Sequence, residues 1–95
     1  MKPIELTHAI LEGIPSKLGK GVIIEPKPTT QYLSIYANGK LLVMLYAYKA
    51  YVTVEKPTKS KKGNPTSKKI MSVEDERDVS IALEEIKKLY LERNS

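Results

Sequence analysis

The sequence predicts an α+β domain, because helical apolar spacing at its two ends encloses a central run of strand signals. The clearest strand signal is the stretch from Tyr32 to Tyr46, in which Asn38 and Gly39 separate two apolar segments. Asn-Gly is the dipeptide most typical of a two-residue β-hairpin turn, since both positions need positive φ. The fold class we expect is an N-terminal helix, three or four antiparallel strands and a C-terminal helix packed on the sheet.

The first helix is expected over about residues 3–12. Pro3 suits a first helical turn, and apolar residues recur at helical intervals at Ile4, Leu6, Ile10, Leu11 and Ile14. Gly13 and Pro15 are expected to end it. A short β-branched strand, Val22 to Glu25, should follow and should end at Pro26 and Pro28 as an edge strand.

The hairpin register is expected to place Tyr36 opposite Leu41 and Ile35 opposite Leu42. One face would then carry Leu33, Ile35, Leu42, Met44 and Tyr46, and the other Tyr32, Ser34, Tyr36, Leu41, Val43 and Leu45. A third strand, from Ala50 to Glu55, would put Val52 and Val54 on one side and Tyr51 and Thr53 on the other. Two alternatives stay open, since the tyrosines could be open to solvent or covered by the N-terminal helix.

Positive charge is concentrated in one segment of the chain. The net charge is +5, and residues 56–69 hold six lysines and no acidic residue. Almost nothing apolar lies between Lys56 and about Ile70, so this stretch is predicted to be a mobile basic loop within a single domain spanning residues 1–95.

The C-terminal helix is expected to begin with a capping box, Ser72 to Asp75, and to have acidic residues in its first turn. An apolar stripe of Val79, Ala82, Leu83, Ile86, Leu89 and Tyr90 should cover the sheet.

No catalytic motif is present, and we expect no enzymatic activity and no cofactor. Cysteine is absent and His8 is the only histidine, so cysteine-based metal sites are excluded and any metal site would have to be built largely from carboxylates, for which no calcium-binding loop pattern is present. The longest apolar run, Leu41 to Ala47, is too short to span a bilayer, so a soluble cytoplasmic protein with no membrane partner is expected.

The functional hypothesis is a small nucleic-acid-binding accessory protein whose partner is DNA or RNA. Flexible lysine-rich arms bind nucleic acid through counterion release, and aromatic side chains on a sheet stack on unpaired bases. The candidate binding residues are Lys56, Lys59, Lys61, Lys62, Lys68, Lys69, Tyr32, Tyr36 and Tyr51. The alternative is a protein–protein interaction module, such as a homodimer formed through an apolar sheet face or the first strand's edge.

Overall fold

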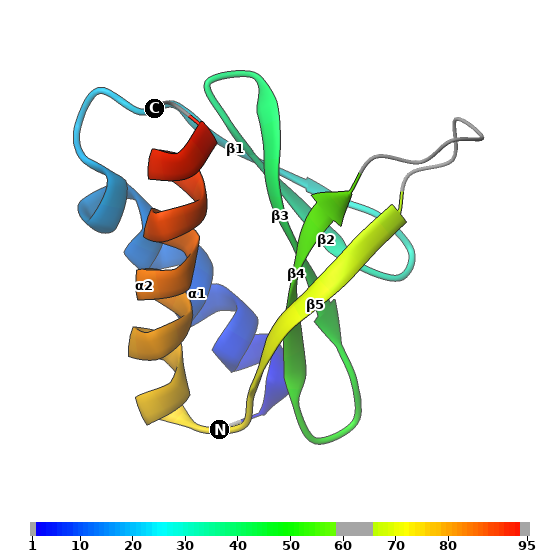
Figure 1. Ribbon diagram of the computed structural model, residues 1–95. Coiled ribbons are helices and arrows are strands. Elements are labelled where there is room, and N and C mark those ends of the chain that lie inside the picture. The colour runs from blue at the N-terminus through cyan, green and yellow to red at the C-terminus, as the bar shows by residue number, and fades with distance from the viewer. Residues whose placement is uncertain (1, 59–65, 94–95) are drawn as a thin grey trace.

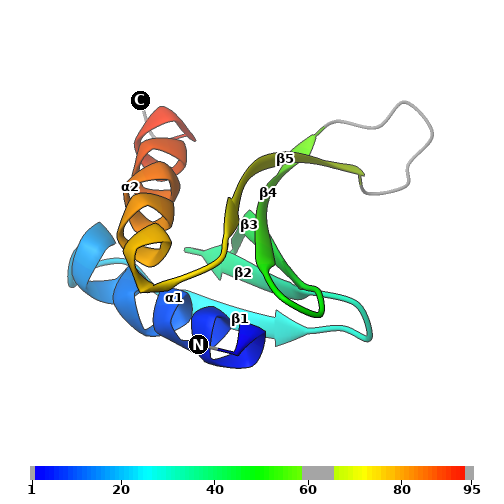
Figure 2. The ribbon, with the colours of Figure 1, turned by 90° about the horizontal axis from the view of Figure 1, so that it is seen from below.

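The computed structural model describes residues 2–58 and 66–93, and its class is the α+β class predicted. Two helices lie on one side of a single antiparallel sheet (Figures 1 and 2). The sheet has five strands in the order β1-β2-β3-β4-β5, one or two more than expected. The elements are α1 (Pro3–Leu18), β1 (Ile24–Pro28), β2 (Leu33–Ala37), β3 (Lys40–Ala47), β4 (Val52–Thr58), β5 (Thr66–Val73) and α2 (Glu76–Arg93).

Helix α1 is longer than the predicted helix, because neither Gly13 nor Pro15 ends it. Ile14 is fully buried two residues beyond the expected end, so packing keeps the chain helical. The helix ends instead at Gly19, whose φ of 107° breaks the helical path. Gly13 has a packing role, since a Cβ there would lie 2.6 Å from Leu83 Cδ1 of α2.

Strand β1 lies at a sheet edge, as predicted, but it contains both prolines instead of ending before them. Pro26 lies opposite Ile35, and Pro28 lies opposite Leu33. An edge strand tolerates proline where the missing N–H would have pointed away from the sheet.

The Asn38-Gly39 turn is confirmed, but the register predicted for the hairpin is correct only next to that turn. Asn38 has φ 51° and Gly39 has φ 82°, and Tyr36 lies opposite Leu41 as expected. A β-bulge then places Ile35 opposite Val43 instead of Leu42. The extra residue exchanges the faces of the rest of β3, because side chains alternate with a period of two.

The core is formed between the helices and one face of the sheet. Its sheet residues include Ile35, Leu42, Val43, Leu45, Val52, Val54 and Val73. From the helices come Leu6, Ile10 and Ile14 of α1 and the predicted apolar stripe of α2, of which Val79, Ala82 and Ile86 are buried. We expect this shared apolar layer to supply most of the stability of the fold.

The predicted start of the C-terminal helix is wrong, because Ser72 belongs to β5. Asp75 caps α2 instead, since its Oδ1 accepts hydrogen bonds from the N–H groups of Arg77 (3.0 Å) and Asp78 (3.2 Å). These hydrogen bonds, of which the one from the Asp78 N–H has the largest effect, hold the pKa of the Asp75 carboxyl below its usual value. A salt bridge between Lys17 and Glu84 joins the helices and lowers the pKa of Glu84.

The segment predicted to be a mobile basic loop is strand at both of its ends. Residues 56–58 belong to β4, and residues 66–70 belong to β5, where Lys56 pairs with Lys68. Paired backbone groups on a neighbouring strand compensate for the lack of apolar side chains in this stretch. The prediction for Lys59, Lys61 and Lys62 falls outside the described residues.

Candidate nucleic-acid interface

The sheet face turned away from the helices carries three tyrosines, one just before β2, one in β2 and one in β3. We call it the tyrosine face and define it by Tyr32, Tyr36 and Tyr46. No described helix lies over this side of the sheet (Figure 2). Of the two alternatives left by the sequence, a cover by the N-terminal helix is not observed, and the three tyrosines are half-buried.

The bulge in β3 explains why the tyrosine face has this composition. Met44 lies opposite Ser34, and Tyr46 lies opposite Thr53, so these side chains share the face with Tyr36. Val43 and Leu45, which were expected beside the tyrosines, are fully or almost fully buried on the helix side. Without the bulge, Val43 and Leu45 would lie beside the tyrosines, and this apolar face would need another element to cover it.

The tyrosines are held by contacts within the face. The rings of Tyr32 and Tyr46 are 4.9 Å apart and tilted by 33°, and the Lys27 Nζ lies 4.5 Å from the centre of the Tyr36 ring. All three tyrosines are half-buried, and beneath them Met44 retains only 3% of its exposed surface. Their rings therefore provide apolar surface with restricted rotamers, which reduces the entropy lost on stacking.

Tyr51 lies just before β4, at the turn that joins it to β3. Its ring stacks on Tyr48, with centroids 4.9 Å apart and an interplanar angle of 20°. Alternation from Thr53 places Tyr51 on the same side as the tyrosine face, as the sequence predicted. Tyr51 is thus stacked on Tyr48, and the Tyr36 ring has Lys27 over it, so a base that stacks on either ring must share or displace an existing contact.

Charge on this side of the sheet is balanced. Lys27 and Glu25 project from β1, while Lys69 lies opposite Glu55. The Glu55 carboxylate accepts hydrogen bonds from Thr53 Oγ1 (2.9 Å) and Ser67 Oγ (2.6 Å). The face thus combines stacking surface with one cation at each side, and most of any phosphate attraction must come from elsewhere.

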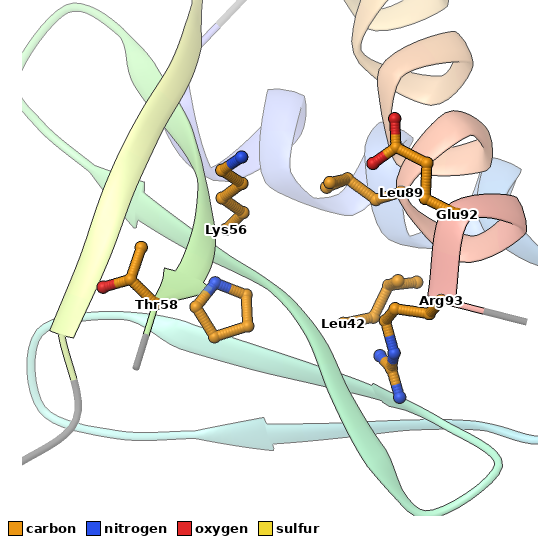
Figure 3. A pocket seen from close by; sticks show the side chains of 7 residues that line it. Leu42, Lys56, Thr58, Leu89, Glu92 and Arg93 are labelled. Atoms are coloured by element: carbon orange, nitrogen blue, oxygen red, sulfur yellow. The ribbon is translucent and has the colours of Figure 1, made fainter. Parts of the chain in front are cut away.

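The candidate lysines do not all share this face. Lys56 and its partner Lys68 lie on the helix side, where Lys56 lines a cleft of about 420 Å³ between β4 and the end of α2 (Figure 3). Lys56 and Glu92 project from opposite walls of this cleft, and Arg93 donates a hydrogen bond to the Leu41 carbonyl (2.7 Å). Because the cleft contains both signs of charge, we do not assign it as an anion site.

Sequence reasoning missed Tyr46 of the tyrosine face and Lys27, which lies over the Tyr36 ring. Tyr46 was assigned to the opposite face because an apolar run from Leu41 to Leu45 has no alternation that could reveal a bulge. Lys27 is not among the predicted binding residues, because the strand is expected to end at Pro26 and Pro28. The alternation of charged residues with prolines from Glu25 to Pro28 could have indicated that the edge strand continues through this segment.

A second concave site lies between α1 and the β1–β2 turn. This groove of about 540 Å³ is lined mainly by apolar side chains, among them Ile4, Leu11, Pro28 and Leu45, and His8 lies exposed at it. Within the described residues, no cluster of three His, Asp or Glu side chains could hold a metal ion. The described helices include none that is long and apolar enough to cross a membrane.

Comparisons with protein-family models, curated proteins and solved structures give no match for this chain.

Proposed function

We propose that this chain is a non-catalytic protein that binds single-stranded nucleic acid through the tyrosine face and the lysines of residues 56–69. The observation that supports this function is that Tyr36 and Tyr32 are only half-buried and lie on a sheet side with no described helix over it. Unpaired bases stack on such aromatic platforms regardless of sequence, whereas a duplex keeps its bases out of reach.

The two parts of the interface have different tasks in this proposal. The tyrosines select unpaired bases, and the lysines supply phosphate contacts that depend on salt but not on sequence. Lys27 and Lys69 flank the tyrosine face and would hold the backbone of a bound strand at its margins. An acidic oligomer without bases should therefore bind less tightly than an oligonucleotide of equal charge.

The test is binding of a fluorescein-labelled dodecamer of deoxythymidine or uridine at about 20 mM salt, where the counterion contribution is strong. Tyr36→Ala should weaken binding by about 1–3 kcal/mol for each base that it stacks, while Tyr36→Phe should retain most of the affinity. Leu91→Ala is the matched control, because Leu91 is exposed on α2, across the sheet from the tyrosines.

Folding is checked in the same variants by urea denaturation. Tyr36→Ala should cost less than about 3 kcal/mol of stability, the lower bound typical of a fully buried aromatic residue. Absence of binding by the wild-type protein, or equal losses for Tyr36→Ala and Leu91→Ala, would contradict the proposed function.

A protein partner on the tyrosine face is the second candidate function, because tyrosine and methionine are enriched in protein interfaces. Tyr48, which is exposed and stacks on Tyr51, extends the tyrosine surface that such a partner could contact. The oligonucleotide assay separates the two, since a protein-binding face gives no salt-dependent retention of single strands.

A further inference from the structure

The two outer edges of the sheet differ in their capacity to accept another strand. At β1, hydrogen bonds from Thr29 N to Tyr32 O and from Asn38 N to Ile23 O define which residues pair with β2. Because antiparallel pairing alternates, the backbone groups of Pro26 and Pro28 face outward. Proline has no N–H, so this edge lacks two of its outward donors.

At β5 the outward donors are intact, since residues 66–73 contain no proline. The hydrogen bond from Tyr48 N to Tyr51 O shows that the backbone groups of Tyr51 point toward β3. Because the direction alternates along an antiparallel strand, the backbone groups of Lys56 point toward β5, where they pair with those of Lys68. Over Thr66–Lys69 the pairing is regular, so the N–H groups of Ser67 and Lys69 point away from the sheet, and a bulge at Ile70 ends the regular edge on that side. In Figure 1 this strand forms the edge nearest the viewer.

The charges along β5 decide which kind of strand fits. Lys68 and Lys69 are consecutive, so their side chains lie on opposite faces, and both are exposed. Lys56 lies opposite Lys68 and adds a third positive charge. A second copy of β5 centred on the same residues would bring lysines against lysines, which destabilises cross-strand pairs.

We propose that the β5 edge binds an extended acidic segment of another protein by strand addition. Two consecutive acidic residues of that segment would lie beside Lys68 and Lys69, one on each face of the extended sheet. The main chain of the segment would pair with the outward groups of Ser67 and Lys69. This inference shares Lys68 and Lys69 with the proposed nucleic-acid function, but it adds the backbone edge of β5, which that function does not use.

The probe is an acetylated and amidated peptide, Thr-Val-Thr-Glu-Glu-Val-Thr, whose binding is followed by amide chemical shifts of the labelled protein. The shifts should change along β5 and not along β1. A peptide with Lys-Lys in place of Glu-Glu tests the charge, and an acidic peptide N-methylated at alternate residues tests the backbone pairing. Both control peptides should bind at least about tenfold more weakly, the equivalent of one or two hydrogen bonds.

Two substitutions at one position separate charge from backbone in the protein. Lys69→Gln removes the charge and should weaken binding of the acidic peptide by about two- to fivefold, as for an exposed ion pair. Lys69→Pro also removes the outward N–H but leaves the bonds to β4, and should weaken binding by a further factor of about ten. Lys88→Gln on α2 is the control with the same change of charge.

Equal affinity of the Lys69→Gln and Lys69→Pro variants would overturn the proposal, as would shift changes confined to the tyrosine face. Dimerisation of the free protein with changes along β5 would identify a second copy as the occupant and would also overturn it. If Lys69→Pro does not fold, Ser67→Pro replaces it, because the Ser67 N–H also points outward.

Discussion

At the scale of single residues, small or polar side chains determine how the helices are placed. Gly13 allows α1 to approach α2 closely, and Asp75 begins α2 at the end of β5. Neither residue forms part of the apolar core. Their contributions are nevertheless separable by substitution, because each acts through one identified contact.

Gly13→Ala should destabilise the protein only when Leu83 is present. The added Cβ would lie 2.6 Å from Leu83 Cδ1, so the side chain must shift at a cost of about 1–2 kcal/mol. In a Leu83→Ala background, the same change should stabilise the protein by up to about 1 kcal/mol through helix propensity. A double-mutant cycle measured by urea denaturation tests this, and additive effects would show that the contact carries no strain.

The capping role of Asp75 predicts a dependence of stability on pH. Its pKa is lowered in the folded protein, so its contribution is complete above its unfolded value and is lost as the pH falls through the folded value. Asp75→Asn keeps a capping oxygen without titration and should therefore lose less stability between pH 7 and pH 3 than the wild type does. Urea midpoints at the two pH values measure this difference, and equal acid sensitivity would exclude the capping carboxylate as its source.

At the scale of elements, the β2–β3 hairpin connects most of the fold. Its turn residue Asn38 accepts a hydrogen bond from Ile23 N (2.9 Å) and donates one to the Tyr90 hydroxyl (3.3 Å). One turn residue thus joins the hairpin to the start of β1 and to α2. The bulge that follows directs the tyrosines to one side and the aliphatic residues to the other.

Replacing both turn residues by valine should destabilise the whole domain. Each valine would need positive φ at a cost of about 1–2 kcal/mol, and the side-chain bonds of Asn38 would also be lost. Asn38→Gly keeps the conformational freedom and should lose only the bonds, about 0.5–1.5 kcal/mol each. Thermal unfolding of the three proteins gives the comparison, and an unchanged midpoint for the double valine variant would contradict the importance of this turn.

At the scale of the whole molecule, apolar and charged groups are separated between layers. The helices and the aliphatic sheet face enclose the core, whereas the tyrosines occupy the other face and the excess lysines lie between residues 56 and 69. This separation allows loss of lysines without loss of core packing. A charge-based prediction can therefore be tested in a protein that stays folded.

Changing Lys59, Lys61 and Lys62 to glutamine should flatten the salt dependence of nucleic-acid binding. Three lost phosphate contacts correspond to a decrease of about 2 in the log–log slope for single strands. Changing Lys20, Lys87 and Lys88 to glutamine alters the net charge equally and should leave the slope nearly unchanged. Binding isotherms from about 20 to 200 mM salt provide the slopes, and equal slopes for both triple variants would show that net charge alone matters.

Local signals in the sequence were sufficient for the fold class, the Asn38-Gly39 turn and the apolar stripe of α2. Each depends on neighbouring residues alone, either through backbone conformation at positive φ or through helical periodicity. The tyrosines and lysines of the candidate interface were also recognisable by type. Which of them share a face was not, since Lys69 lies on the side of the tyrosines and Lys56 and Lys68 on the helix side.

Tertiary structure decided the features in which distant segments compete for the same residues. Pro15 remains helical because Ile14 is buried in the core, and residues 66–70 form a strand because β4 offers them hydrogen-bond partners. The bulge after Leu41 arises where apolar residues must face the helices and the tyrosines must not. A local pattern cannot encode these outcomes, because the free energy that selects them comes from packing and pairing across the sheet.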